Sequence, residues 1–190
     1  MQAISDALNR LLEDGGWFTR ARDHALWLVR VRGDLRHSAP RILAGLEFHA
    51  DNRAPWAVLE EAHTADDDGW AIRANVLAAN WRARRDAFRE REGIEMPAAA
   101  LAEGTPPTGV AYFRATAAGV LGALRPPLDG SLVAVLAPTV VGDVEAMGRE
   151  LEALAKDPAL ASCRWVWVLE ASLPTPTLLE LLGPVAMQTE

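Results

Sequence analysis

The chain has 190 residues, a formal charge of −7 at pH 7 and 50% hydrophobic residues. This length and composition predict one globular domain with an apolar core of its own, and they exclude a disordered chain. The acidic balance disfavours non-specific binding to nucleic-acid phosphates, and no apolar stretch reaches the roughly 18 residues that a membrane span needs.

The basic residues are unusual, because eighteen are Arg and the single Lys is Lys156. Together with seven Trp, this bias is typical of a GC-rich genome, so we expect a bacterial protein. The first residues show no basic segment followed by an apolar run, and the expected location is the cytoplasm. Cys163 has no second cysteine to pair with, and it opens an apolar run where we expect a packing role.

The amino-terminal segment predicts a helix over residues 3–13, which Gly15 and Gly16 should end. Four apolar residues at helical spacing should pack this helix on a sheet: Ile4, Leu8, Leu11 and Leu12. Residues 25–31 form a short apolar run, rich in large side chains, that predicts a buried strand ending at the turn Gly33-Asp34.

Residues 38–49 allow two interpretations. Ser38 and Pro40 resemble the start of a helix, whereas alternation of apolar and other side chains from Ile42 to Phe48 resembles a strand. We favour the strand. Its partner would be residues 56–61, joined through a loop of turn-forming residues to give an antiparallel hairpin.

A long helix is predicted from Trp70 until Gly93 closes it. One stripe of this helix carries Trp70, Leu77, Trp81 and Phe88. Residues 97–109 contain three Pro and two Gly, so they predict an internal loop. The apolar spacing over residues 113–124 predicts the next helix.

The carboxyl-terminal part predicts a strand over residues 132–137, a helix over 144–156 that Asp143 caps, and a strand over 165–169. Strand, helix and strand in about forty residues form a βαβ unit, whose two strands should be parallel. A last helix is expected to carry Leu178, Leu179 and Leu182.

These elements predict an α/β fold. We expect a single domain over residues 1–190 with a mixed β-sheet, in which antiparallel N-terminal strands join the C-terminal parallel βαβ unit, and helices flank both faces.

Nucleotide-binding motifs are absent from the sequence. There is no GxxxxGK[ST] and no GxGxxG, and Lys156 lies at the end of a predicted helix, far from any Gly-rich turn. We therefore expect no standard ATP or GTP binding and no cofactor.

The sequence LEFHADNR holds the most suggestive polar cluster. Glu47, His49 and Asp51 could share a proton or bind a metal in a small hydrolase, with Asn52 and Arg53 as candidate ligand-binding residues. The alternative that we favour is an Asx-type turn with solvent-facing side chains. No HExxH or second histidine cluster completes a metal site, so none is expected.

The Arg-rich part of the long helix could form a nucleic-acid surface through Arg82, Arg85 and Arg89. Acidic residues alternate with these cations, and ion pairs such as Arg82 with Asp86 explain the pattern without a ligand. We favour a solvated helix face over an RNA-binding module.

The resulting expectation is a non-catalytic protein that binds another protein as an adaptor or regulatory subunit. Trp and Arg are enriched at binding hot spots. Five aromatic residues are the candidate interface: Trp17, Trp56, Trp70, Trp81 and Phe88. The competing interpretation places all of them in the core.

Overall fold

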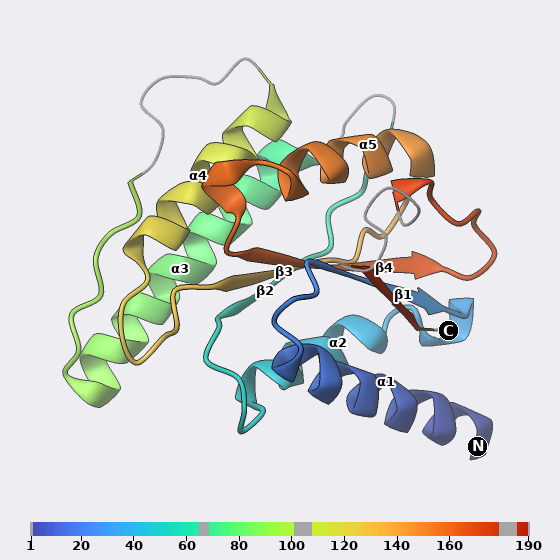
Figure 1. Cartoon of the computed structure of the whole chain (residues 1–190), viewed down its shortest axis with the longest axis horizontal. Helices are drawn as coiled ribbons and strands as arrows, with labels where there is room; N and C mark the ends of the chain where they lie inside the picture. The colour runs from blue at the N-terminus through green and yellow to red at the C-terminus, as the bar shows by residue number, and fades with distance from the viewer. Residues whose placement is uncertain (1, 65–68, 101–107, 179–185, 190) are drawn as a thin grey trace.

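The computed structural model describes residues 2–64, 69–100, 108–178 and 186–189, and of residues 2–5 it describes the backbone alone. At its centre lies one sheet whose five described strands are all parallel, in the order β2-β3-β4-β1-β5 (Figure 1). The strands are β1 (Leu26–Val31), β2 (Trp56–Leu59), β3 (Leu132–Leu136), β4 (Cys163–Glu170) and β5 (Ala186–Thr189).

The expected antiparallel hairpin, and with it the mixed sheet, is wrong. Within residues 38–49, where we expected the first strand of this hairpin, the chain forms helix α2 (Ala39–Gly45) and a 3-10 turn, η2 (Leu46–Phe48). Pro40 lies in the first turn of α2, where its missing N–H costs no hydrogen bond. Leu43 and Leu46, three residues apart, are buried, whereas Phe48 is 86% exposed. The helical connection brings β2 into the sheet parallel to the other strands.

The apolar runs predicted as strands over residues 25–31, 56–61, 132–137 and 165–169 are confirmed as β1 to β4. The βαβ unit is also confirmed, because β3 and β4 are parallel neighbours joined through α5 (Val144–Ala155). Asp143 caps α5 as expected, since its Oδ1 accepts a hydrogen bond from the Ala146 amide at 2.9 Å.

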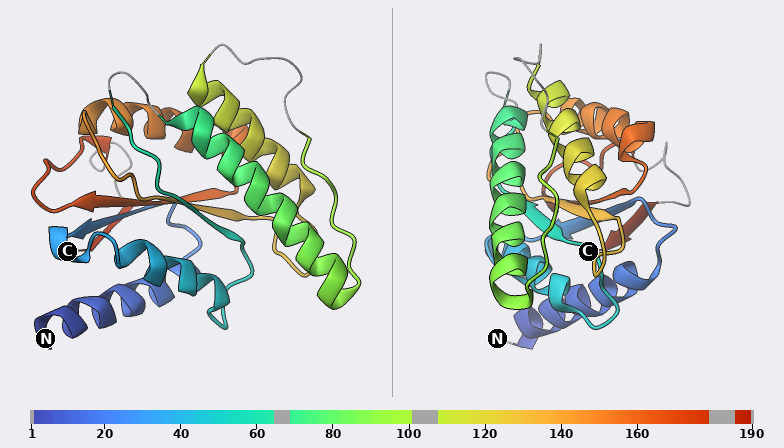
Figure 2. Two further views of the ribbon diagram at one scale, coloured as in Figure 1. Left: turned by 180° about the vertical axis from the view of Figure 1, so that it is seen from behind. Right: turned by 90° about the vertical axis from the view of Figure 1, so that its left-hand side faces the viewer.

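Helices cover both faces of the sheet. One face carries α1 (Gln2–Arg20) and α2, which form the α1–α2 layer, and the other carries α3 (Trp70–Glu92), α4 (Gly109–Ala123) and α5 (Figures 1 and 2). Gly93 ends α3 with φ 68°, a left-handed conformation that glycine adopts without strain. Within the described ranges, no helix combines the length and the apolar character needed to cross a membrane.

Alternating strand residues build a separate core on each face. Leu26 and Leu28 of β1 pack toward α3, α4 and α5, whereas Trp27, Val29 and Val31 pack toward α1 and α2. Six of the seven tryptophans are buried in these cores, and they include three of the proposed interface residues: Trp56, Trp70 and Trp81. Those three therefore cannot form an exposed interface.

Helix α1 does not end at Gly15 and Gly16 but continues to Arg20. A Cβ added at Gly15 would lie 2.2 Å from Leu46 Cδ1, and one at Gly16 would lie 3.3 Å from His49 Nε2. The two glycines therefore let α1 approach η2 and the residue after it, instead of breaking the helix. The prediction that apolar residues of α1 pack on the sheet is confirmed only in part. Leu11 is buried and Leu8 is half-buried, but Leu12 is 47% exposed. The side chain of the fourth, Ile4, lies outside the described part.

The edge strand β5 was not expected from the sequence. It pairs with β1, in a register that places Val29 opposite Thr189. The Thr189 hydroxyl lies 2.9 Å from Trp27 Nε1 and 2.9 Å from Asp14 Oδ2. This chain of hydrogen bonds ties the end of the sheet to α1. The last helix expected from the sequence falls on residues that the structure does not describe, apart from Leu178.

Candidate functional site

The carboxyl edge of the sheet has a topological switch point between β1 and β4. After β1 the chain turns through η1 (Gly33–Leu35) toward the α1–α2 layer, where Leu35 is buried. After β4 it reaches Pro176 and Leu178 on the opposite side, beside Gly148 of α5. In open α/β sheets, ligands bind where neighbouring strands send their connections to opposite faces.

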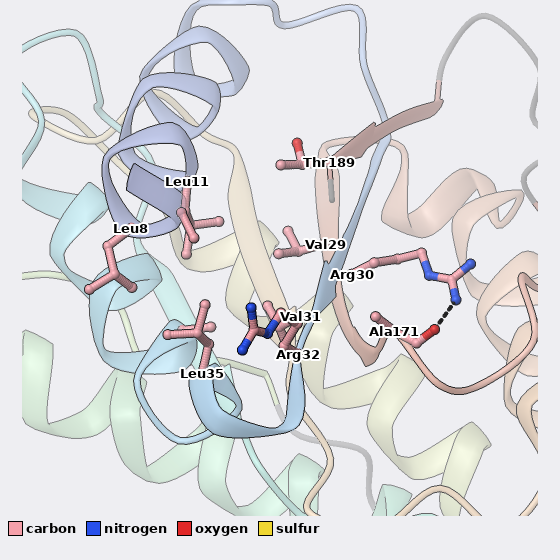
Figure 3. A pocket seen from close by; sticks show the side chains of 11 residues that line it. Leu8, Leu11, Val29, Arg30, Val31, Arg32, Leu35, Ala171 and Thr189 are labelled. Atoms are coloured by element: carbon pink, nitrogen blue, oxygen red, sulfur yellow. Dashed lines mark hydrogen bonds between the residues drawn. The ribbon is translucent and has the colours of Figure 1, made fainter. Parts of the chain in front are cut away.

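An apolar pocket with a volume of about 370 Å³ opens at this edge, between α1 and β1 (Figure 3). Such a volume lies in the range of small-molecule sites. Its apolar walls come from four consecutive elements, α1, β1, η1 and α2, and from the turn after β4. They are Ala7, Leu8 and Leu11 of α1, Val29 and Val31 of β1, Leu35 of η1, Ala39 of α2, and Ala171.

Three polar residues also line the pocket, and they have different roles. Arg32 has a 72% exposed side chain whose Nη2 donates to Asp34 Oδ2 at 2.9 Å. Thr189 has its hydroxyl engaged by Trp27 and Asp14. Arg30 directs its guanidinium away from the pocket, toward the turn after β4, as Figure 3 shows. Arg32 is therefore the cation available to a ligand in this pocket.

Arg30 braces the turn that follows β4. Its Nη2 donates to the carbonyls of Ala171 at 2.6 Å and Leu173 at 2.7 Å, and its Nη1 donates to the hydroxyl of Thr175. The pocket wall at Ala171 is thus fixed by contacts on the other face of the sheet.

A second, smaller pocket of about 160 Å³ lies beyond the carboxyl ends of β1, β3 and β4. Arg36 lines it and donates from Nη2 to the Pro138 carbonyl at 3.1 Å, while its Nη1 lies 3.5 Å from Glu170 Oε2. Val31 lines both pockets, so they flank the same strand end. The edge therefore combines an apolar volume with two nearby arginines.

A polar pocket of about 220 Å³ occupies the opposite, amino edge of the sheet. Arg22 pairs with Asp129 at 2.6 Å. Burial lowers the pKa of Arg164 to about 10, and its guanidinium donates to the carbonyls of His24 at 3.0 Å and Ala21 at 2.9 Å. These contacts join the loop between α1 and β1 to β4, which gives Arg164 a structural role.

No protein-family model, curated protein or solved structure matches this chain.

The LEFHADNR cluster adopts a compact turn. His49 Nδ1 accepts a hydrogen bond from the Asp51 amide at 3.2 Å and lies 3.8 Å from Asp51 Oδ2, while Glu47 pairs with Arg84 of α3. Across the described residues, no three His, Cys, Asp or Glu side chains gather as ligands for a metal ion. The structure thus brings His49 and Asp51 together, and gives Glu47 a partner on another helix.

Asn52 holds this turn in place. Its Nδ2 donates to the carbonyls of Glu47 and Ala54 at 2.8 and 2.7 Å, and its Oδ1 accepts from the Ala54 amide and from Trp56 Nε1. These four hydrogen bonds explain Asn52 without a ligand. Arg53 is exposed beside it.

The arginines proposed for nucleic-acid binding lie on one side of α3 and differ in their contacts. Arg85 Nε donates to the Met96 carbonyl at 2.8 Å, which fastens the segment after α3, and Arg89 pairs with Asp86 at 2.9 Å. Arg82 is exposed on the same helix. The pairing of Asp86 with Arg89 replaces the expected pairing with Arg82.

Cys163 is buried at the start of β4, where desolvation raises the pKa of its thiol well above the usual value. A neutral, buried thiol has the packing role that the sequence predicts.

Sequence reasoning missed a polar cluster at the end of β2. His63 is buried, and its Nε2 lies 3.5 Å from Glu150 Oε2, which also accepts a hydrogen bond from Trp70 Nε1 at 2.8 Å. Arg73 is fully buried nearby and donates to the Glu61 carbonyl. A lone histidine in the sequence gave no signal, because its partners come from α3 and α5.

Proposed function

We propose that the protein is a non-catalytic interaction subunit, an adaptor or regulatory component of a bacterial multiprotein system in the cytoplasm. The observation that supports this proposal is the outward exposure of large apolar side chains on the α1–α2 layer. Phe48 of η2 is 86% exposed, Leu12 of α1 is 47% exposed and Trp17 of α1 is 43% exposed.

Of these three residues, Trp17 was among the aromatic residues that the sequence suggested, whereas Phe48 and Leu12 were not. Three of the five exposed large apolar side chains in the described residues lie on α1 or on η2, which follows α2, and the other two are Ile72 and Val140. An exposed aromatic ring contributes little to folding, whereas it contributes strongly to association when a partner desolvates it. The proposed interface therefore comprises Phe48, Leu12 and Trp17.

The proposal is tested with tagged chains in the cells that encode the protein, by cross-linking and quantitative mass spectrometry. Phe48→Ser and Leu12→Ser should each lower the recovery of a specific partner at least tenfold. Ile72→Ser and Val140→Ser are matched controls, since their side chains are 48% and 51% exposed outside α1, α2 and η2, and they should retain that partner.

Equal recovery of every associated protein by all four variants and the wild type would overturn the proposal. Thermal unfolding of each purified variant, followed by circular dichroism, separates lost binding from lost folding.

A further inference from the structure

The pocket between α1 and β1 is bordered by different residues at the two ends of the β1 segment that lines it. Val29 lies level with Thr189 in the sheet register, and two residues further along β1 the strand ends at Val31, followed by Arg32. The site thus runs along the strand from Thr189 to Arg32. The hydroxyl of Thr189 is already hydrogen-bonded, whereas the side chain of Arg32 lies in solvent.

The walls between these ends suit an aliphatic chain. Leu11, Val29, Val31 and Leu35 are each at most 9% exposed, so their side chains already shape the cavity from within the fold. An apolar cavity of about 150 Å³ holds benzene, so the 370 Å³ here has room for an unbranched chain of roughly ten carbons. Burying such a chain releases water from apolar surface on both partners.

The open end supplies a complementary charge. The guanidinium of Arg32 is largely in solvent, and its ion pair with Asp34 is an exposed one, which contributes little and exchanges readily. A carboxylate can bind a guanidinium through two parallel hydrogen bonds. The cation therefore lies where the head of a bound chain would emerge.

We propose that this pocket binds a medium-chain aliphatic carboxylate of about eight to twelve carbons, with the chain between α1 and β1 and the carboxylate at Arg32. The ligand is a small amphiphile, and its site is distinct from the exposed residues proposed for protein binding.

The direct test is isothermal titration calorimetry of the full chain with decanoate, decanol and decylamine. We expect saturable 1:1 binding of decanoate, weaker binding of decanol and the weakest binding of decylamine, because only the carboxylate complements Arg32. Absence of saturable decanoate binding, or equal affinity for all three compounds, would overturn the proposal.

Two pairs of variants locate the site. Ala7→Phe fills the pocket from α1 and should lower decanoate affinity at least tenfold, whereas Ala153→Phe, at an exposed position of α5, should not. Arg32→Ala should lower decanoate affinity about tenfold and leave decanol unaffected, and Arg32→Lys should restore most of the loss.

Binding that is insensitive to both Ala7→Phe and Arg32→Ala would place the ligand elsewhere and overturn the assignment. Decanoate binding should persist in Phe48→Ser, because Phe48 belongs to the proposed protein interface and not to this pocket. The ligand site and the protein interface can therefore be disproved independently of each other. A comparison of decanoate with vesicles of a decanoyl phospholipid distinguishes a free carboxylate from a membrane lipid, and preference for the vesicles would contradict the proposal.

Discussion

The hydroxyl of Thr189 accepts a hydrogen bond from the indole Nε1 of Trp27 at 2.9 Å, across 162 positions of the sequence. The same hydroxyl donates to Asp14 Oδ2, so one side chain links β1, β5 and α1. Both Trp27 and Thr189 are buried, which makes the hydroxyl the partner on which the indole depends.

Replacing this hydroxyl should destabilise the protein. Thr189→Val keeps the shape of the side chain but leaves a buried indole N–H without its acceptor, which costs about 1–3 kcal/mol. Urea unfolding followed by tryptophan fluorescence measures the change. Thr177→Val removes an exposed hydroxyl whose hydrogen bond to Glu145 Oε1 lies in solvent, so it should change the free energy of unfolding by less than about 0.5 kcal/mol; equal effects of the two variants would contradict the role assigned to Thr189.

Two glycines of α4 should respond in opposite ways to alanine. A Cβ at Gly119 would lie 2.1 Å from the backbone oxygen of Ala100, so Gly119→Ala must displace the segment after α3 and should lower stability by about 1–3 kcal/mol. At Gly122 no atom lies within 4 Å of the added Cβ, and alanine should stabilise the helix by up to about 1 kcal/mol. Thermal melts of the two variants compare these shifts, and a stabilised Gly119→Ala would show that the close approach is not required.

Asp129 should contribute a pH-dependent part of the stability. Burial alone would raise the pKa of Asp129, but hydrogen bonds from Ser131 and the nearby charge of Arg22 outweigh burial and hold this pKa below its usual value. A carboxyl whose pKa is lower in the folded state stabilises the fold above its unfolded pKa, and this contribution disappears as the pH falls through the folded value.

The wild type should therefore exceed Asp129→Asn in stability from about pH 5 to pH 7, and the difference should shrink below about pH 4. Denaturant unfolding at a series of pH values measures it. In an Arg22→Gln background the difference should be smaller from about pH 5 to pH 7, where Asp129 is ionised; an unchanged difference would exclude the ion pair as its cause.

Asn52 should matter more to the fold than its two neighbours in the cluster. Asn52→Ala removes four hydrogen bonds and should cost about 2–3 kcal/mol, whereas His49→Ala and Asp51→Ala should each stay within about 1 kcal/mol of the wild type. Chemical denaturation provides the comparison. We also expect titrations with zinc and with manganese to give the same binding curves for the wild type and for these three variants. Metal binding by the wild type that both His49→Ala and Asp51→Ala abolish would instead support the metal-dependent enzyme.

Strands β1 to β4 could be located from the sequence because each is a compact run of large apolar residues. The segment of α2 could not be assigned, because Ile42, Ala44, Leu46 and Phe48 mimic strand alternation, and only the position of Leu46 against Gly15 makes the helix the better packed choice. The same contact explains why Gly15 does not end α1. Such pairings depend on tertiary structure, and no local pattern reports them.

The apolar pocket could not be predicted from the sequence for a related reason. Nine of its eleven lining residues lie between Ala7 and Ala39, but the pocket is complete only when Ala171 after β4 and Thr189 of β5 lie beside β1. The LEFHADNR cluster attracted attention because its polar residues are adjacent in sequence. Neighbouring polar residues are common in turns, where Asn52 here bonds to the backbone on both sides.

The position of β1 has a consequence for biosynthesis. This strand leaves the ribosome well before its two partners, because β4 and β5 both lie more than 130 residues downstream. Until β4 has emerged, this apolar strand has no neighbour on either edge, a state that favours aggregation. Truncated nascent chains should therefore depend on chaperones for solubility until β4 has emerged.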